Sequence, residues 1–226
     1  MKLTHNGLTL ETFPFGSLEV NGTIIATAEG NCIVIDAGDN FHEFDLLASQ
    51  LQIKPLLQLY THAHFDHISA AKKIKEKWQA PIALSKNDAP LYAQLREQTA
   101  RFGMPVQEPT VVDYLLSADS AITCDDPLLA KFLSSMKIIE TPGHTRGCIC
   151  FYTEWFGRSI LIAGDTLFYQ SIGRTDLPGG NFNDIINSIK NKLLTLPENT
   201  LVITGHGPGT TIGNEARLNP YLNGSC

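Results

Sequence analysis

The sequence of 226 residues lacks any apolar run of the length that a membrane span requires, and its N-terminus lacks the apolar core of a signal peptide. It also lacks a block rich in lysine and arginine, and its formal net charge is −6. Nucleic-acid-binding surfaces need a basic patch that neutralises phosphates. We therefore expect neither a membrane nor a nucleic acid as a partner.

Cysteine is scarce, with five residues in the chain. The odd number and the missing signal peptide predict reduced thiols and a cytoplasmic location. Cys148 and Cys150 are separated by one residue in an expected strand, so we expect both side chains to face the core. The content of 43% hydrophobic and 18% charged residues is typical of a globular protein, and we expect a single domain over residues 1–226.

Histidine, by contrast, is concentrated in one short stretch, LLQLYTHAHFDHISAAKKIKEKW at residues 56–78. Its first residues form an apolar run that predicts a buried strand, and its last part has apolar residues at helical spacing. Between them lie His62, His64, Asp66 and His67. Unpaired imidazoles and carboxylates are costly to bury, and a divalent metal would satisfy all of them. The stretch therefore predicts a metal site on a turn between a strand and a helix.

Three later segments repeat the order of apolar strand, glycine and ligand-type residue: KIIETPGH, ILIAGD and LVITGH. They add His144, Asp165 and His206 to the candidate ligands. In α/β sheets, sites gather beyond the carboxyl ends of strands, where the loops converge. Strands rich in Ile, Leu and Val that alternate with helices predict such an α/β fold. We expect the preceding glycines to allow close approach of the backbone.

Other elements follow from turn and capping signals. Asp36 ends an apolar run and is expected beside the metal loop if the strands lie in sequential order. Residues 41–50 are predicted to be helical, and Asn87-Asp88 is expected to cap a helix that runs to about residue 102. Residues 110–132 are expected to form an irregular excursion with an edge strand. Asn183 is expected to cap a later helix.

Seven ligand-type side chains are too many for one tetrahedral ion. They suit two metals that lie about 3.5–4 Å apart and share a carboxylate. Zinc is the favoured metal for a set of imidazoles and carboxylates, and iron or manganese are the alternatives.

The order H-x-H-x-D-H, then His, Asp and His, resembles that of the metallo-β-lactamase superfamily from Asp36 through His206. The resemblance implies a four-layer αβ/βα sandwich with two metals at one edge of the two sheets. It also implies the ligand sets, with Asp165 bridging between them. One ion would be held by His62, His64 and His144, and the other by Asp66, His67 and His206.

The segments GDTLFYQSIGRTDLPGGN and TGHGPGTTIGNE resemble the glyoxalase II branch, the hydroxyacylglutathione hydrolases and their single-domain relatives. Larger glyoxalase II enzymes append a helical domain that binds glutathione. The chain ends about 20 residues after His206, so we expect no such domain. Arg174 matches a basic residue that contacts glutathione in those enzymes, but Asp176 replaces its aromatic neighbour. Arg174 is therefore a candidate substrate-binding residue, or the partner of Asp176 in an ion pair.

This resemblance implies hydrolysis of a small-molecule thioester of the S-lactoylglutathione type. A metal-bound hydroxide would attack the carbonyl, and Asp66 would orient it as a catalytic residue. A thiolate, with a pKa near 8.5, leaves without a proton donor. Two alternatives stay open. One is a persulfide dioxygenase with a single iron on His62, His144 and Asp165. The other is a lactonase or another ester hydrolase of the same superfamily.

Overall fold

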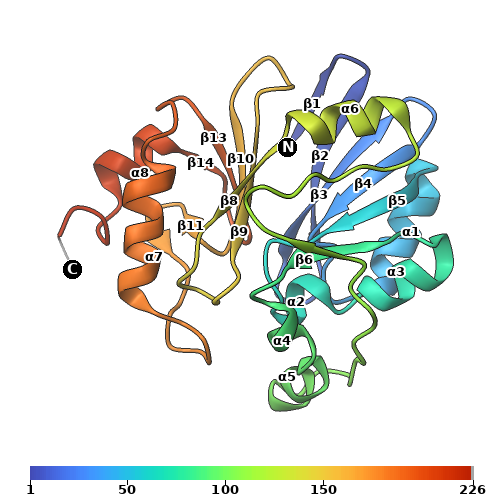
Figure 1. Ribbon diagram of the computed structural model, residues 1–226, viewed down its shortest axis with the longest axis horizontal. Coiled ribbons are helices and arrows are strands. Elements are labelled where there is room, and N and C mark those ends of the chain that lie inside the picture. Colours follow the sequence, from blue (N-terminus) through green and yellow to red (C-terminus); the bar gives the residue numbers. More distant parts are fainter. Residues whose placement is uncertain (225–226) are drawn as a thin grey trace.

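The computed structural model describes residues 1–224. Two β-sheets lie face to face at its centre, and helices cover their outer faces (Figure 1). The first sheet has the strand order β1-β2-β3-β4-β5-β6-β7. Its strands are β1 (Lys2–His5), β2 (Leu8–Phe15), β3 (Val20–Thr27), β4 (Asn31–Ile35), β5 (Lys54–Leu59), β6 (Ile82–Ser85) and β7 (Tyr114–Leu116).

The second sheet has the order β14-β13-β10-β9-β8, and a short hairpin of two strands lies beside it. Its strands are β8 (Lys137–Glu140), β9 (Ile149–Thr153), β10 (Ile160–Gly164), β13 (Leu201–Thr204) and β14 (Thr210–Thr211), and the hairpin is β11 (Leu167–Phe168) with β12 (Ser171–Ile172). The helices are α1 (Phe41–Leu51), α2 (Phe65–Ile68), α3 (Ala71–Trp78), α4 (Ala89–Tyr92), α5 (Leu95–Arg101), α6 (Pro127–Ser135), α7 (Phe182–Ser188) with its π-helical continuation η1 (Ile189–Leu193), and α8 (Ile212–Leu218).

Side chains alternate between the two faces of each strand, and this alternation explains the layers of the fold. On β4, Ile33 and Ile35 point into the core between the sheets, whereas Cys32 and Val34 pack toward α1 and α3. On β10, Ile160 and Ile162 face the same central core, and Leu161 and Ala163 face α7 and α8. Helix, sheet, sheet and helix therefore form the predicted four-layer αβ/βα sandwich.

The cysteines of β9 and its neighbourhood agree with this pattern. Cys150 lies in the core between the second sheet and its helices, and Cys148 is 2% exposed. Both thiols are free. The prediction that they are core residues is confirmed.

Three elements of the structure differ from those expected from the sequence. Residues 110–132 contain β7 as expected, but Asp126 accepts hydrogen bonds from two backbone N–H groups and starts α6, which buries Phe132. The helix expected after Asp88 is split into α4 and α5, and the Asp88 side chain caps neither. The cap of α7 is Asn181 rather than Asn183, because its Oδ1 accepts the N–H of Asp184 at 3.1 Å.

The two sheets meet at the edge where several strands end. The N–H of Ile149 donates to the carbonyl oxygen of Thr61 at 2.9 Å, which joins the second sheet to the loop after β5. The N–H of Gly205 donates to the carbonyl oxygen of Gly164 at 2.7 Å. The carboxyl ends of β5, β10 and β13 are thereby held close together, so the loops that follow them share one space.

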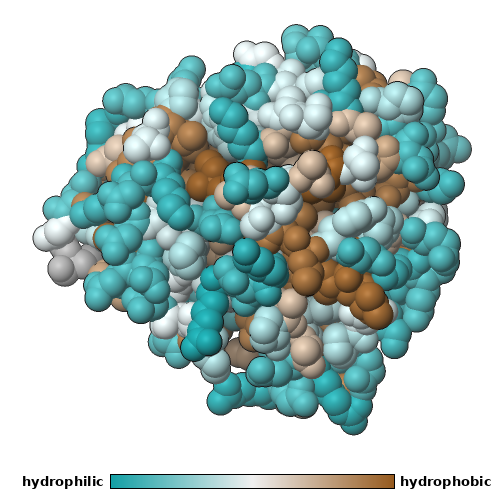
Figure 2. Space-filling model, viewed as in Figure 1, coloured by the Kyte–Doolittle hydropathy of each residue, from teal (hydrophilic) through white to brown (hydrophobic). Residues whose placement is uncertain are grey.

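The molecular surface is largely polar. In the face shown in Figure 2, apolar side chains gather over β7, the edge strand of the first sheet, where Leu115 is 58% exposed. Among residues 1–224, none of the helices combines the length and the apolar character that crossing a bilayer would take.

Candidate metal centre

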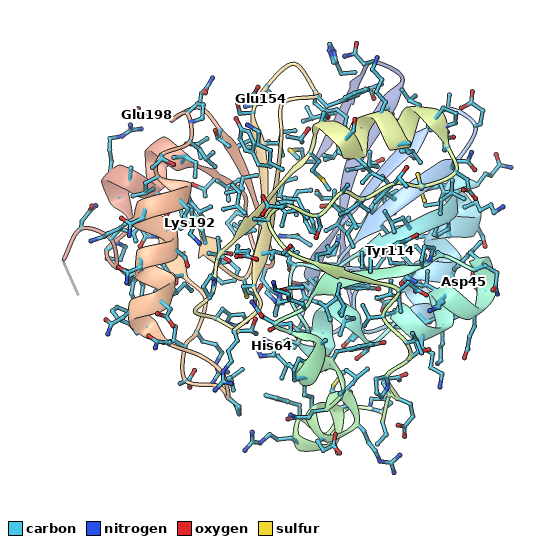
Figure 3. The ribbon with its side chains drawn as sticks, in the orientation of Figure 1. Asp45, His64, Tyr114, Glu154, Lys192 and Glu198 are labelled. Carbon is cyan, nitrogen blue, oxygen red and sulfur yellow. The ribbon has the colours of Figure 1, made fainter. Side chains whose placement is uncertain are left out.

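All seven predicted ligands come together at the shared edge of the sheets. The first four lie on the turn between β5 and α2, and His64 occupies the N-cap position of α2. His144 follows β8, Asp165 follows β10 and His206 follows β13. Figure 3 shows His64 near the junction of the two sheets, close to α2. The convergence expected from the four strand ends is confirmed.

The donor atoms form three overlapping groups, each with its atoms within 4.8 Å of one another. These groups are His62, His64 and His144; His62, His67 and Asp165; and Asp66, His67 and His206. Asp165 lies between the outer two groups. Its Oδ1 is 3.3 Å from Nε2 of His67, and its Oδ2 is 3.4 Å from Nε2 of His144. Oδ2 is also 3.7 Å from Nε2 of His206, so this one carboxylate lies close to members of both outer groups.

The cluster contains buried polar atoms without a hydrogen-bond partner, namely Nε2 of His62, Nε2 of His67 and Oδ1 of Asp165. Each unpaired buried group costs about 1–3 kcal/mol. All three atoms point into one donor group, and imidazole nitrogens and carboxylate oxygens are ligands for divalent metals. The residues therefore fit a divalent metal, which would satisfy the atoms that the protein leaves unpaired.

Hydrogen bonds on the outer side of the rings orient the imidazoles. Four rings have Nδ1 at hydrogen-bond distance from an oxygen, which directs Nε2 into the cluster. The pairs are His62 with Thr61 Oγ1 (3.1 Å), His67 with Asp36 Oδ2 (3.0 Å), His144 with the carbonyl oxygen of Arg174 (2.7 Å) and His206 with the carbonyl oxygen of Leu18 (2.7 Å). His64 is turned the other way, with its Nδ1 2.8 Å from Nε2 of His144.

Asp36 supports two of these rings. Its Oδ1 accepts the N–H of Thr61 at 2.8 Å, and its Oδ2 accepts the hydroxyl of Thr61 at 2.7 Å as well as Nδ1–H of His67. The hydroxyl of Thr61 can then accept Nδ1–H of His62. The expectation that Asp36 lies beside the metal loop is confirmed, and it acts on the donors without being one of them.

Asp88 is a second buried carboxylate, 1% exposed, and the sequence assigned it only to a helix cap. Its Oδ2 accepts the N–H of Ala63 at 2.9 Å and the hydroxyl of Thr145 at 2.8 Å. Its Oδ1 accepts the N–H of Gly147 at 2.7 Å. Asp88 therefore joins the loop that carries His62 and His64 to the loop that carries His144.

Burial and charge set the protonation of the imidazoles in the cluster. Burial lowers the pKa of His62 well below its ordinary value, and the neighbouring His67 lowers it further. Burial and then His144 lower the pKa of His64 to about 3. Burial also acts to lower the pKa of His67, but the surrounding carboxylates, Asp165 first, outweigh it and raise that pKa well above its ordinary value. His62 and His64 are thus neutral and ready to bind a metal, whereas His67 holds a proton.

Glycine before two of the ligands is required by close packing. A Cβ on Gly205 would lie 2.0 Å from Oδ1 of Asp165, and a Cβ on Gly164 would lie 2.3 Å from Oγ1 of Thr61. Gly164 also has a φ of +48°, which disfavours other residues. The predicted close approach at these strand ends is confirmed.

The donors open onto a cavity of about 340 Å³. It is lined by Leu18, His64, Phe65, Asp66, Phe102, His144, Asp165, Phe168, Arg174, Leu177 and His206. Arg174 forms a two-pronged ion pair with Asp176, in which Nε and Nη2 each donate to a carboxylate oxygen at 2.8 Å. Both side chains are more than half exposed. Arg174 therefore lies at the cavity and is paired there with Asp176.

The fold and the donor set are those of an α/β protein with a site suited to divalent metals. Residues 16–206 match the family model of the metallo-β-lactamase superfamily, and the chain belongs to this superfamily. It is 36% identical to the probable metallo-hydrolase YqgX of Bacillus subtilis, over 93% of this chain and 96% of that protein. It is 33% identical to the hydroxyacylglutathione hydrolase GloC of Haemophilus influenzae, over 96% and 99% of the two chains.

Solved structures agree with the fold. The BLEG-1 B3 metallo-β-lactamase superposes with a TM-score of 0.83 at 33% identity, over 95% of this chain and 99% of that chain. TTHA1623 in a di-iron-bound form superposes with a TM-score of 0.82 at 33% identity, over 94% and 100% of the two chains. At equal identity, one structure is named a β-lactamase and the other is described by its two irons alone.

The first prediction concerns Asp36→Asn. Asn tolerates the positive φ of 54° at this position, so the backbone is retained. The amide cannot accept all three hydrogen bonds that the carboxylate accepts, so the rings of His62 and His67 lose orientation. We expect a metal affinity about 10–100-fold lower, measured by competition with a chelator. Asp45→Asn on the surface of α1 is the control, and equal affinities for both variants would contradict the role of Asp36.

The second prediction concerns pH. Because the pKa of His67 is raised, its proton is held at pH 7 and is lost only as the pH rises through that raised pKa. A metal at Nε2 must displace this proton, whereas His64, with a pKa of about 3, has none to release. We expect at least one proton released per chain on Zn²⁺ uptake near pH 7, and about a tenfold gain in affinity per pH unit for each proton displaced. Calorimetric titration in buffers of different ionisation enthalpy measures this, and a heat independent of buffer would contradict it.

Proposed function

We propose that the protein is a metal-dependent hydrolase of small-molecule thioesters, of the hydroxyacylglutathione type. One observation carries the proposal. Among the described residues, the lining of the metal cavity holds no acidic or phenolic group besides the donors themselves. A thiolate, with a pKa near 8.5, leaves without a proton, whereas an amide nitrogen needs one. The cavity is thus suited to a substrate whose leaving group needs no dedicated acid.

We propose two metal ions. His62, His64 and His144 would hold one, Asp66, His67 and His206 the other, and Asp165 would bridge them. The support is the position of Asp165, which offers a separate oxygen to His67 and to His144. Imidazole and carboxylate donors suit zinc, iron or manganese. Zinc is the proposed metal, and TTHA1623 at 33% identity holds two irons. Bound metals of this kind supply Lewis acidity and lower the pKa of bound water.

Asp66 is the proposed catalytic residue. Burial acts to raise the pKa of Asp66, but the charge of His67 and a hydrogen bond from His206 outweigh it and lower that pKa. The carboxylate is therefore ionised at neutral pH. It lines the cavity, and Nε2 of His206 lies 3.2 Å from its Oδ2. In this position it can accept a hydrogen bond from the attacking water and orient it toward the carbonyl carbon of the substrate.

The names of the relatives support the same class of enzyme, a metal-dependent hydrolase. GloC, which matches this chain over nearly its whole length, carries the name of a hydroxyacylglutathione hydrolase. YqgX is described as a probable metallo-hydrolase. The BLEG-1 structure carries the name of a β-lactamase, so a lactam belongs among the substrates tested.

The third prediction is the test of this function. The protein as isolated should contain about two metal ions per chain and should hydrolyse S-lactoylglutathione. Asp66→Ala should abolish turnover, and the control variant Asp45→Ala, on α1 and outside the lining of the metal cavity, should not. Assays of a β-lactam, and of oxygen uptake with glutathione persulfide, complete the set. A single iron with oxygen uptake and no thioester cleavage would identify a dioxygenase and refute the proposal.

The fourth prediction concerns Arg174, which we propose as a binder of a substrate carboxylate, for which a guanidinium is suited. Such a contact is worth about 1.5–3 kcal/mol, so Arg174→Ala should raise the KM of anionic thioesters by roughly one to two orders of magnitude. Neutral thioesters should be nearly unaffected. Asp176→Ala, which frees the guanidinium from its ion pair, should lower the KM of the same anionic substrates. Equal losses on neutral and anionic substrates, with a lower melting temperature, would assign Arg174 to scaffolding.

A further inference from the structure

A second cavity, of about 180 Å³, opens beside the metal cavity. The two share His64, Phe102 and Leu177, so the side cavity begins at a metal donor. Its other walls come from α4 and α5 and from the loop before α7; they are Leu91, Gln94, Glu97, Gln98, Arg101 and Pro178. The side cavity is therefore adjacent to the space in which a metal-bound group would lie.

One wall of the side cavity is fixed to the metal loop by Gln98. Its Oε1 accepts the N–H of Phe65 at 3.2 Å, and its Nε2 donates to the carbonyl oxygens of Ala63 at 3.1 Å and Leu91 at 2.9 Å. Phe65 also stacks on Phe102, with 5.0 Å between the ring centroids. Helix α5 is thereby held against the loop that carries His62 and His64.

The opposite wall is fixed in the same way. The carbonyl oxygen of Arg174 accepts Nδ1–H of His144, and Leu177 and Pro178 follow three and four residues later on this loop. The hydrogen bonds that orient the donors therefore also set the width of the side cavity. Such a preformed space next to a reactive centre is typical of a substrate-binding site.

The lining indicates an uncharged, apolar occupant. Leu91, Phe102 and Leu177 supply carbon surface, and Phe102 is 47% exposed although it lies next to the donors. Covering such an aromatic ring is favourable. Glu97 and Arg101 lie one helical turn apart at the cavity and carry opposite charges, so the cavity has no net charge. The cavity therefore offers an ionic group no net electrostatic attraction to replace its hydration.

We propose that this side cavity binds the acyl chain of the substrate and that the preferred acyl group is a medium-length aliphatic or aromatic one. The inference rests on the proposed hydrolase function. The carbonyl must lie at the donors, and the two parts of the substrate then extend in different directions. Arg174 and its ion pair lie at the metal cavity but not at the side cavity, so the polar thiol extends toward Arg174. A lactoyl group is small and would leave the side cavity largely unfilled.

The test compares acetyl, butyryl, hexanoyl and benzoyl thioesters of glutathione. We expect kcat/KM to rise about three- to fourfold for each CH₂ that enters the cavity. Gln94 is exposed and its side chain caps no helix, so Gln94→Trp can narrow the cavity without breaking a contact. This variant should lower the hexanoyl-to-acetyl ratio of kcat/KM at least tenfold. Gln50→Trp, an exposed site on α1, is the matched control and should keep the ratio.

A binding measurement that needs no turnover separates the two proposals. Titration of the metal-loaded protein with acetate, butyrate and hexanoate should show affinity that rises with chain length, and Gln94→Trp should remove this rise. If no thioester is cleaved but this pattern appears, the hydrolase proposal fails and the side cavity still binds apolar acyl chains. If thioesters are cleaved without dependence on the acyl chain, or if only the length of an S-alkyl thiol matters, the acyl assignment is wrong.

Discussion

The structure depends on the gathering of seven polar donors, six of them buried, at the edge where two sheets meet. His62 and His67 are fully buried, and each leaves a ring nitrogen without a partner, as does the carboxylate of Asp165. Such a cluster is expensive for an isolated chain, since each unpaired group costs on the order of a kilocalorie or more per mole. A divalent metal bound by these atoms would remove this cost. Stability and metal binding are therefore coupled through the same atoms.

Two buried carboxylates that are not donors keep this arrangement in place. Asp36 fixes the rings of the first loop through Thr61 and His67, and Asp88 joins that loop to the one that carries His144. Asp36 accepts mainly from side chains, and Asp88 accepts mainly from the backbone. Together they hold donors from both sheets before any metal is present, which reduces the reorganisation that metal binding would otherwise require.

The donors could be predicted because they depend on local order, whereas the four-layer arrangement was predicted from the resemblance to the metallo-β-lactamase superfamily. An apolar strand followed by glycine and a ligand is visible in the sequence, and all seven ligands meet as expected. The role of Asp88 in joining two loops could not be predicted, because its partners Ala63 and Gly147 lie 25 and 59 residues away in the sequence. The local pattern of Asn-Asp before Ala-Pro favours a helix cap instead. Helix α6 was missed although Asp126 and Pro127 are a start signal, because the preceding residues are irregular. The side cavity depends on contacts of Gln98 that no pattern reveals.

The loops that would position the metals also build the walls of the substrate cavities. The geometry of the metal centre and the shape of the cavities therefore cannot vary independently. His144 is oriented by the backbone of Arg174, on the loop that carries Leu177, and Gln98 ties α5 to the backbone of Ala63 and Phe65. A backbone shift in either wall would therefore change the metal centre as well as the cavity. Side chains that line the cavity without supporting a donor, such as Gln94 and Leu91, are free of this constraint. Divergence in acyl preference among chains with this metal centre is accordingly easiest at those positions, where a change of size alters the cavity and leaves the hydrogen bonds to the donors intact.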